Sequence, residues 1–376
     1  MRKPSLLVLL LAASATFVLA QVHAPKLTFQ NSNTNQLLIA VSPVNSQVVW
    51  AAGTGGVFVV TTDGGNTWKS GTVPGAEQLQ FRDVQGVSDQ IAYLLSIGND
   101  PDNFQIYKTT DGGDTWSIEF TNQDALAFYD CFAFWTPTTG IAHSDSGNGV
   151  FPDLRTTDGL TWQSIANNMP PALPGEASFA ASGTCITAQG LTNAWITTGG
   201  AAISRVLATT DGGNTWHAYN TPLYSSPSAG GISIAFRDAL HGIVGGGDLS
   251  NNFYGQVATS SNGGKSWTMV NSPPVPGAIF CLAYANGQPL LGDNTDSSTT
   301  SDSADAKPMS NPYTRTVVVT TETEPNYASG SAAWTPDEGK HWHTLSQVSG
   351  YWAVAFADPQ DGWFVGNNGQ ILKISF

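Results

Sequence analysis

An octet of residues that returns six times constrains this chain more than any other feature of its sequence. The first copy is Thr-Thr-Asp-Gly-Gly-Asn-Thr-Trp at 61–68, and near-identical copies stand at 109–116 and 209–216. Looser copies stand at 260–267 and 335–342, and a copy one residue shorter stands at 156–162. The closing tryptophans are 48, 46, 54, 51 and 75 residues apart. A unit of roughly 50 residues at such a period is typical of the blades of a β-propeller.

Each octet has the chemistry of a tight turn between two strands. Apolar alternation precedes it, as at 56–60, and the Asp-Gly-Gly core supplies a capping side chain and glycines that tolerate positive φ. The Trp opens the next strand and can bury a large ring between neighbouring units. We therefore expect a structural role, rather than catalysis or metal binding, for the following residues of the octets: Asp63, Trp68, Asp111, Trp116, Asp158, Trp162, Asp211, Trp216, Asn262, Trp267, Asp337 and Trp342.

The pattern Ser/Thr-x-Asp-x-Gly-x-Thr/Ser-Trp resembles the Asp-box, also called the BNR repeat. Proteins with this repeat include sialidases, xyloglucanases, sortilin-type receptors and the photosystem II stability and assembly factors. The assembly factors are the most similar in box sequence and in the pattern Phe-x-Asp-x-x-x-Gly-Trp-x-Val-Gly at 356–366. The resemblance implies a propeller fold, whereas function stays open because propellers host unrelated activities.

Counting strands predicts one more blade than there are boxes. Six four-stranded units begin at Leu37 and near Leu79, Asp130, Ala177, Gly231 and Gly277. Three further apolar runs, at 351–356, 362–366 and 370–374, have no box and no fourth strand, and Lys26–Phe29 has the alternation that the missing strand needs. We predict an all-β, seven-bladed propeller of four-stranded antiparallel blades. The N- and C-terminal strands together complete the last blade, which leaves no open sheet edge.

The first twenty residues read as a secretory signal peptide. Arg2 and Lys3 precede an apolar stretch, and Val18-Leu19-Ala20 forms a cleavage site before Gln21. The apolar stretch is too short to span a bilayer. We expect a secreted or periplasmic protein without a membrane span, in which residues 21–376 form a single propeller domain.

The charge balance argues against a nucleic-acid partner. The whole chain has a formal net charge of −14, and loss of Arg2 and Lys3 with the signal makes it more negative. A strongly acidic chain without a Lys/Arg cluster repels nucleic acids and anionic membrane surfaces.

Three cysteines follow the signal, at 131, 185 and 281, each in an apolar strand-like run. An odd count leaves at least one free thiol in an exported protein. We expect buried, unpaired cysteines, and a disulfide between Cys131 and Cys185 is the alternative.

One large insertion interrupts the sixth unit. Residues 293–329 are acidic and rich in Ser and Thr, with few apolar residues before Val317. We expect a loosely ordered loop, and a lid over one face of the propeller is the alternative.

The resemblance places the functional groove on the face away from the boxes, where the first strands begin and the second-to-third loops lie. We expect one shared binding face there, made of Arg82, Asp83, Tyr129, Asp130, Asp145, Glu176, Arg205, Asp248, Asn252 and Tyr351. Four carboxylates are candidates for catalysis: Asp130, Asp145, Glu176 and Asp248. Arg237 lies at the other end of its strand, so we expect it on the boxed face.

We compare three hypotheses for the function of this chain. We favour a non-catalytic, monomeric scaffold that binds a protein or a glycan through this face. The photosystem partner itself is not implied, because the assembly factors use an arginine-rich patch that this acidic chain lacks. The alternative is a glycoside hydrolase that uses a carboxylate pair. A sialidase is disfavoured, because it needs a third arginine and has six blades.

A redox enzyme is the third function, and no feature of the sequence supports it. There is no Gly-x-Gly-x-x-Gly turn after a strand and no Cys-x-x-Cys-His site. We expect no cofactor and no bound metal.

Overall fold

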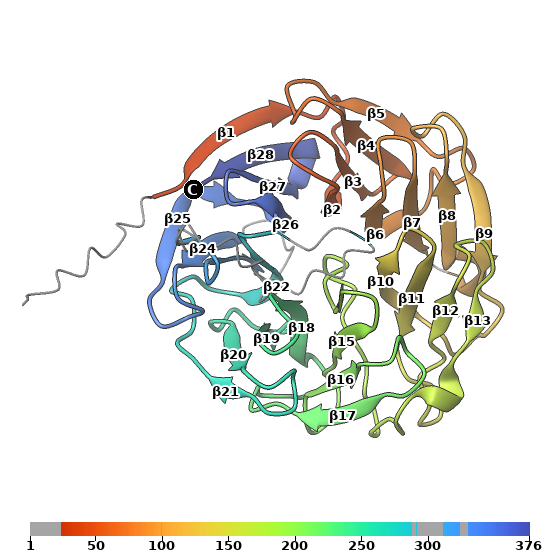
Figure 1. Cartoon of the computed structure of the whole chain (residues 1–376), viewed down its shortest axis with the longest axis vertical. Coiled ribbons are helices and arrows are strands. Elements are labelled where there is room, and N and C mark those ends of the chain that lie inside the picture. Colours follow the sequence, from red (N-terminus) through yellow and green to blue (C-terminus); the bar gives the residue numbers. More distant parts are fainter. Residues whose placement is uncertain (1–23, 99, 288–290, 292–310, 324–329) are drawn as a thin grey trace, which may run out of the picture.

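The chain folds into seven four-stranded antiparallel sheets arranged around one central axis (Figure 1). The computed structural model describes residues 24–98, 100–287, 291, 311–323 and 330–376. The predicted seven-bladed, all-β propeller is confirmed. The predicted signal peptide falls within residues 1–23, outside the described residues.

The strands of each blade follow one another from the axis outward, apart from the last blade. Blade one consists of β2 (Leu38–Pro43), β3 (Val49–Gly53), β4 (Val57–Thr61) and β5 (Lys69–Thr72). Blade two consists of β6 (Gln80–Gly86), β7 (Ala92–Ile97), β8 (Gln105–Thr109) and β9 (Ser117–Thr121). Blade three consists of β10 (Tyr129–Thr136), β11 (Thr139–Ser144), β12 (Leu154–Thr156) and β13 (Gln163–Ser164). Blade four consists of β14 (Ile186–Gln189), β15 (Asn193–Thr197), β16 (Arg205–Thr209) and β17 (His217–Asn220). Blade five consists of β18 (Ala229–Phe236), β19 (Gly242–Asp248), β20 (Gln256–Ser260) and β21 (Thr268–Met269). Blade six consists of β22 (Ala278–Tyr284), β23 (Val317–Glu322), β24 (Ser331–Thr335) and β25 (His343–Ser349). The described residues also include three 3-10 turns, at Pro101–Asn103, Ala166–Asn168 and Asn367–Gly369.

Both ends of the chain build the seventh blade, as predicted. Its sheet has the order β1 (Lys26–Asn31), β28 (Gln370–Ser375), β27 (Asp361–Gly366) and β26 (Tyr351–Asp358). Lys26 pairs with Ser375 and Asn31 pairs with Gln370, so β1 runs along the full length of β28. The ring is therefore closed by backbone hydrogen bonds between the two ends of the chain.

The box residues form turns, which accounts for their repetition. In the first box the Thr61 hydroxyl oxygen accepts the Gly65 N–H at 2.9 Å, and the Asp63 carboxylate accepts the N–H and the hydroxyl of Thr67 at 2.9 and 2.7 Å. Gly64 and Gly65 have φ of 71° and 86°, where a side chain would be strained. The hydrogen bonds from Thr67 lower the pKa of Asp63 to about 2. These contacts use both oxygens of the carboxylate inside its own turn.

All six boxes lie on one face of the disc, which we call the boxed face. The Gly64 N–H donates to Gln47 in the turn between the first and second strands, and Gly112 and Gly263 donate likewise to Gln90 and Leu240. The boxed face therefore carries the box turns together with the first-to-second turns. The fourth-to-first connections and the second-to-third loops lie on the other face, which we call the opposite face.

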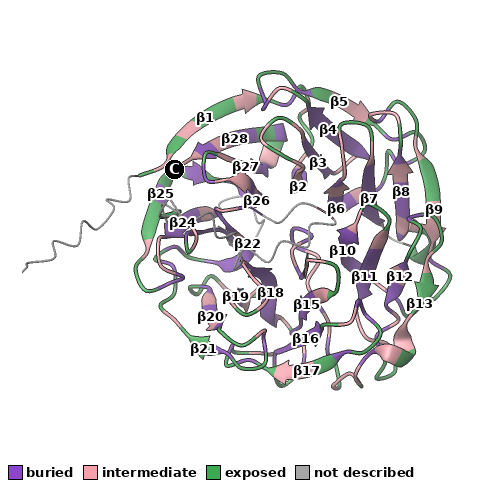
Figure 2. Ribbon diagram, viewed as in Figure 1, coloured by how far each residue is buried: buried purple, intermediate pink, exposed green. Residues whose placement is uncertain are grey.

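Large aromatic rings fill the space between blades. Trp50, Trp135, Trp195 and Trp363 are fully buried, and the Trp195 ring stacks on Phe236 of the next blade at 3.6 Å between centroids. Figure 2 shows buried residues along the inner strands and exposed residues on the outermost strands and the loops. The core is thus a set of layers between neighbouring sheets.

Blade four begins later than predicted. Its first strand starts at Ile186, and Ala177 makes only an isolated bridge with Gly199. The residues between them turn toward the axis, where Phe179 and Ala181 pack with Ile39, Phe280 and Trp352 from three other blades. We call residues 178–184 the axial plug.

The expectation of unpaired cysteines is wrong for two of the three. Cys131 in β10 and Cys185 form a disulfide, with Cα atoms 6.1 Å apart, while Cys281 is free and buried. The bond joins blade three to the end of the axial plug. Burial alone suits a thiol and a disulfide equally, which is why sequence context did not separate them.

The predicted insertion at 293–329 is too long. Its later part contains β23, the second strand of blade six, because the run Val317-Val318-Val319 is buried in the sheet. Residues 292–310 and 324–329 lie outside the described residues, so the loop and lid alternatives stay predictions. Among the residues that the structure does describe, no helix is long and apolar enough to cross a membrane.

Candidate functional site

The predicted binding residues all lie at the strand ends and loops of the opposite face, yet most of them are not exposed. Asp83, Tyr129, Asp130, Glu176, Arg205 and Tyr351 are buried. Arg82, Asp145 and Asp248 are partly buried, and Asn252 is exposed. Arg237 lies on the boxed face as expected, where it donates to Glu338 of the sixth box at 2.8 Å.

Glu176 is held by an ion pair with Arg205. Its Oε1 accepts the Arg205 Nε–H at 2.8 Å and the Thr198 hydroxyl at 2.7 Å, and its Oε2 accepts a second Arg205 N–H and the Leu173 N–H. The Glu176 side chain is fully buried. A bidentate pair with every lone pair used positions the loops of blades three and four, and leaves no free oxygen for a substrate.

The carboxyl groups of Asp130 and Asp145 are neighbours, and each affects the pKa of the other. Burial raises the pKa of Asp130 well above its usual value, and the charge of Asp145 raises it further. Burial also raises the pKa of Asp145, whose Oδ1 accepts the Ser178 N–H at 2.8 Å. Burial and the neighbouring charge together disfavour ionisation of both carboxyl groups at once.

Arg82 fastens the axial plug. Its guanidinium donates to the Ala180 carbonyl and to Gln80, both at 2.9 Å, and lies 5.6 Å from the centre of the Trp352 ring. Burial lowers the pKa of Arg82 to about 10, although the negative charge of Asp130 acts to raise it. The arginine predicted to face a ligand therefore contacts a loop of its own chain.

A serine of the axial plug, Ser178, is linked through a histidine to an aspartate, and sequence reasoning did not connect these three residues. His143 Nδ1 lies 2.9 Å from Asp153, and Nε2 lies 3.0 Å from the Ser178 hydroxyl. The Ser178 hydroxyl donates its proton to the Thr197 carbonyl at 2.8 Å. The Thr197 carbonyl accepts the Ser178 hydroxyl proton, so this proton is not directed at His143 Nε2 as it is between a nucleophile and its base. The contact joins a strand and two loops of different blades, so no local motif could have revealed it.

The remaining predicted residues shape loops and core. Asp248 accepts the Ser250 N–H at 3.0 Å and the Asn251 side-chain N–H at 2.6 Å, which caps the loop after β19. Burial raises the pKa of Tyr351 to about 12, and its ring packs on Phe364 at 5.8 Å. Within the described part of the chain, no three His, Cys, Asp or Glu side chains are grouped as a metal site requires.

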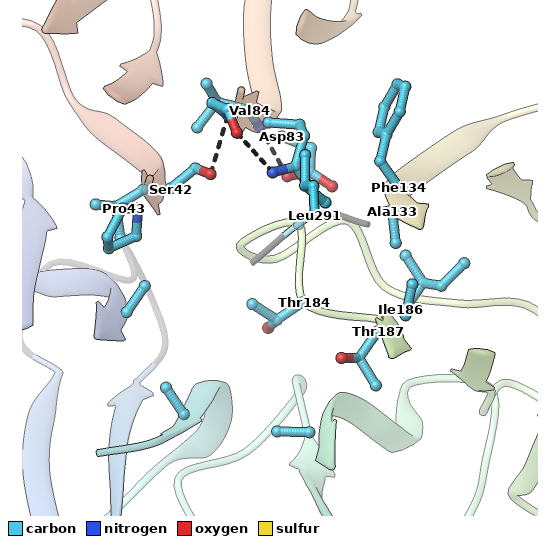
Figure 3. A pocket seen from close by; sticks show the side chains of 18 of the residues that line it. Ser42, Pro43, Asp83, Val84, Ala133, Phe134, Thr184, Ile186, Thr187 and Leu291 are labelled. Atoms are coloured by element: carbon cyan, nitrogen blue, oxygen red, sulfur yellow. Dashed lines mark hydrogen bonds between the residues drawn. The ribbon is translucent and has the colours of Figure 1, made fainter. Parts of the chain in front are cut away.

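A cavity of about 490 Å³ follows the axis, lined by the first strands of all seven blades. Asp83 and Thr184 of the axial plug lie at its inner end, and Val44, Val87 and Gly190 line it at the first-to-second turns of the boxed face. Figure 3 shows Asp83, Thr184 and Phe134 around it. None of the four candidate catalytic carboxylates lines this cavity.

The opposite face carries exposed apolar side chains that sequence reasoning missed. Six of them, 41% to 78% exposed, come from loops of blades three to five: Leu126, Val150, Ile203, Tyr224, Phe253 and Tyr254. We call this set the apolar arc. The adjacent aromatic pair at 253–254, inside a loop of polar residues, is the one signal that the sequence offers.

The loops beneath the apolar arc are joined from blade to blade. Ala172 donates to Gly149, Gly200 donates to Ala229, and the Tyr224 N–H donates to the Gln256 side chain at 2.7 Å. The arc is therefore carried by a continuous, hydrogen-bonded set of loops.

The two faces differ in the charge that they carry. Within the described ranges, Arg82 and Arg205 are the cations of the opposite face, and both are tied up in the contacts given above. The other described cations lie at the boxed ends of strands or in boxed turns: Lys26, Lys69, Lys108, Arg155, Arg237, Lys265, Arg315, Lys340 and Lys373. Exposed carboxylates on the opposite face include Glu77, Asp100, Asp102 and Asp124.

No protein-family profile matches this sequence, and no curated protein does. Solved structures resemble the chain over nearly its whole length. The structure of YCF48 bound to D1 peptide is 16% identical, with a TM-score of 0.61, and the match covers 95% of this chain and 99% of that one. YCF48 from Cyanidioschyzon merolae is 17% identical, with a TM-score of 0.60, over 93% of this chain and 98% of that one.

A glycoside hydrolase also shares the fold. The GH74 xyloglucanase from Xanthomonas campestris is 13% identical, with a TM-score of 0.58, over 92% of this chain and 53% of that chain. This chain thus spans about half the length of the xyloglucanase. Identities this low show a common propeller architecture, and that architecture serves both a peptide-bound protein and an enzyme.

Proposed function

We propose that this protein is a non-catalytic binding scaffold, exported from the cell, that holds a protein partner on its opposite face. The observation that carries the proposal is the apolar arc, because exposed apolar side chains gathered on one face mark interaction sites. The axial cavity reaches the boxed face instead, so the arc is the feature of the opposite face that fits a partner.

The contacts of the candidate catalytic carboxylates support a binding role rather than catalysis. Retaining glycosidases hold two carboxyl groups about 5 to 5.5 Å apart and inverting ones about 6.5 to 9.5 Å apart, with the sugar between them. Here Asp130 is buried beside Asp145, and Glu176 is paired with Arg205. One of the similar propellers, YCF48, is bound to a peptide, which agrees with a protein partner for this chain.

A photocrosslinking amino acid placed at Phe253 tests the proposal in the producing cells. We expect a covalent adduct with one defined protein, identified by mass spectrometry. The matched control is the same amino acid at Leu240, which is 54% exposed on the boxed face and is expected to give no such adduct.

In a second experiment, the purified wild-type protein is incubated with a panel of polysaccharides. We expect no release of reducing sugar. Turnover that Asp130→Asn abolishes, or an adduct from position 240 in place of 253, contradicts the proposal.

A further inference from the structure

We infer that the partner segment is an extended peptide in which apolar side chains alternate with lysine or arginine, bound along the apolar arc. The inference rests on the proposed function and adds the chemistry of the partner to it. Two independent properties of the opposite face carry it, its exposed apolar side chains and its charge.

The loops that carry the apolar arc follow one another across neighbouring blades. Leu126 lies against the backbone of Gly147, in the same turn as Val150. The loop of Ile203 follows in the next blade, where the Ala201 carbonyl accepts the Ser225 hydroxyl beside Tyr224. Tyr254 then bridges to Pro276 at the start of blade six. A row of separated apolar contacts along three blades suits an extended chain, whose alternate side chains face the surface.

The arc has acidic neighbours and no described cation of its own. Asp124 caps Leu126, whose N–H it accepts at 2.9 Å, and Asp248 begins the loop that ends with Phe253 and Tyr254. Carboxylates beside an apolar surface favour partners of positive charge and repel acidic ones.

The exposed aromatics are placed as anchors. Phe253 is the most exposed of the large apolar side chains in the described part of the protein, at 78%. The Asn251 side chain accepts the Phe253 N–H at 2.9 Å, so the loop holds this ring outward by its own hydrogen bonds. Aromatic side chains of this kind supply much of the energy of peptide binding.

Three labelled 12-residue peptides test the inference by fluorescence anisotropy with the purified chain. The first alternates Lys with Phe and Leu, the second replaces every Lys by Glu, and the third replaces Phe and Leu by Ser. We expect binding of the first alone, weakened at least about tenfold between 50 mM and 500 mM salt.

Two variants locate the binding. The double substitution Phe253→Ser with Tyr254→Ser is expected to weaken binding of the first peptide at least about tenfold. The matched control, Leu240→Ser on the boxed face, is expected to leave it unchanged. Asp124→Asn with Asp248→Asn is expected to weaken it about threefold and to reduce its salt dependence.

Equal binding of the Lys and Glu peptides overturns the inference, as does equal loss in the Leu240→Ser control. Tighter binding of neutral oligosaccharides than of the Lys peptide also overturns it. If the peptides fail while the Phe253 crosslink to a native protein persists, the partner chemistry is wrong and the proposed function stands. If both fail, the proposed function is wrong as well.

Discussion

Two sets of carboxylates, one on each face of the disc, are held in opposite ways. On the boxed face, hydrogen bonds from Thr67 and Thr115 lower the pKa of Asp63 and of Asp111 to about 2. On the opposite face, burial raises the pKa of Glu322 to about 8, and raises those of Asp83 and Asp130 well above their usual values. One residue type therefore serves as an ionised turn-former on one face and as a buried, protonated group on the other.

The difference teaches what each face is built to do. The boxed turns are short, local and repeated, so each acid finds its donors within four residues. The opposite face is made of longer loops that differ from blade to blade, and some of its acids find partners far along the chain, as Glu176 does in Arg205, 29 residues away. The repeated face is scaffold, and the variable face is where a specific surface can be built.

The largest expected effect comes from the ion pair of the opposite face. Glu176→Gln leaves the Arg205 guanidinium buried without its counter-charge, so we expect the free energy of unfolding to fall by about 3 kcal/mol. Urea denaturation followed by tryptophan fluorescence measures it. The control is Asp248→Asn, expected to cost less than about 1 kcal/mol because this acid is near solvent. Equal losses would mean that Glu176 is not the structural acid of this face.

The pH dependence of stability separates the two faces. Glu322 has a pKa raised to about 8, so its contribution is full below about pH 4.5 and is lost as the pH rises toward 8. Asp63 has a pKa lowered to about 2, so its contribution is present above about pH 4 and is lost as the pH falls. We expect the melting temperature to be highest near pH 4 to 5.

Glu322→Gln sharpens this comparison. The neutral amide does not ionise, so the fall in melting temperature between pH 5 and pH 8 should become shallower, while the acid limb stays unchanged. Calorimetry in a series of buffers checks both limbs. A variant curve that runs parallel to that of the wild type would show that Glu322 has no part in the alkaline limb.

A box substitution should have a smaller effect, and the chain supplies its own control. Asp211→Ala removes the acceptor for the Thr215 N–H and hydroxyl, and we expect the melting temperature to fall by about 2 to 4 °C. Asp211→Asn should cost less, because Asn262 in the fifth box accepts the Ser266 N–H at 3.0 Å and donates to its hydroxyl. Differential scanning fluorimetry compares the two variants, and the reverse order would contradict this account of the box.

The smallest expected effect is that of the apolar arc on stability. Phe253→Ser with Tyr254→Ser removes side chains that are already exposed, so we expect the melting temperature to stay within about 1 °C of the wild type. A large fall would mean that these rings support the fold and that the arc is not a free surface.

Sequence reasoning reached the fold because the blade signal is local and repeated. Each box contains its own turn, and β1 shows its apolar alternation ahead of the first blade. It did not reach the disulfide, the axial plug or the Asp130–Asp145 contact. These depend on how loops of different blades meet at the axis, and no periodic pattern records the path of a loop such as 178–184. Strand polarity placed Glu176 and Arg205 on one face but could not show that they bind each other.

The sharing of the last blade by both ends of the chain fixes how the molecule can be attached to anything else. Lys26 and Phe376 leave the seventh blade at its boxed end, where the Phe376 N–H donates to Pro359 in the first-to-second turn. A tag or a bead joined directly before Lys26 or after Phe376 would therefore lie on the side of the boxed face. A protein immobilised through either of these positions would still present its loops of Leu126, Ile203 and Phe253 to the solution.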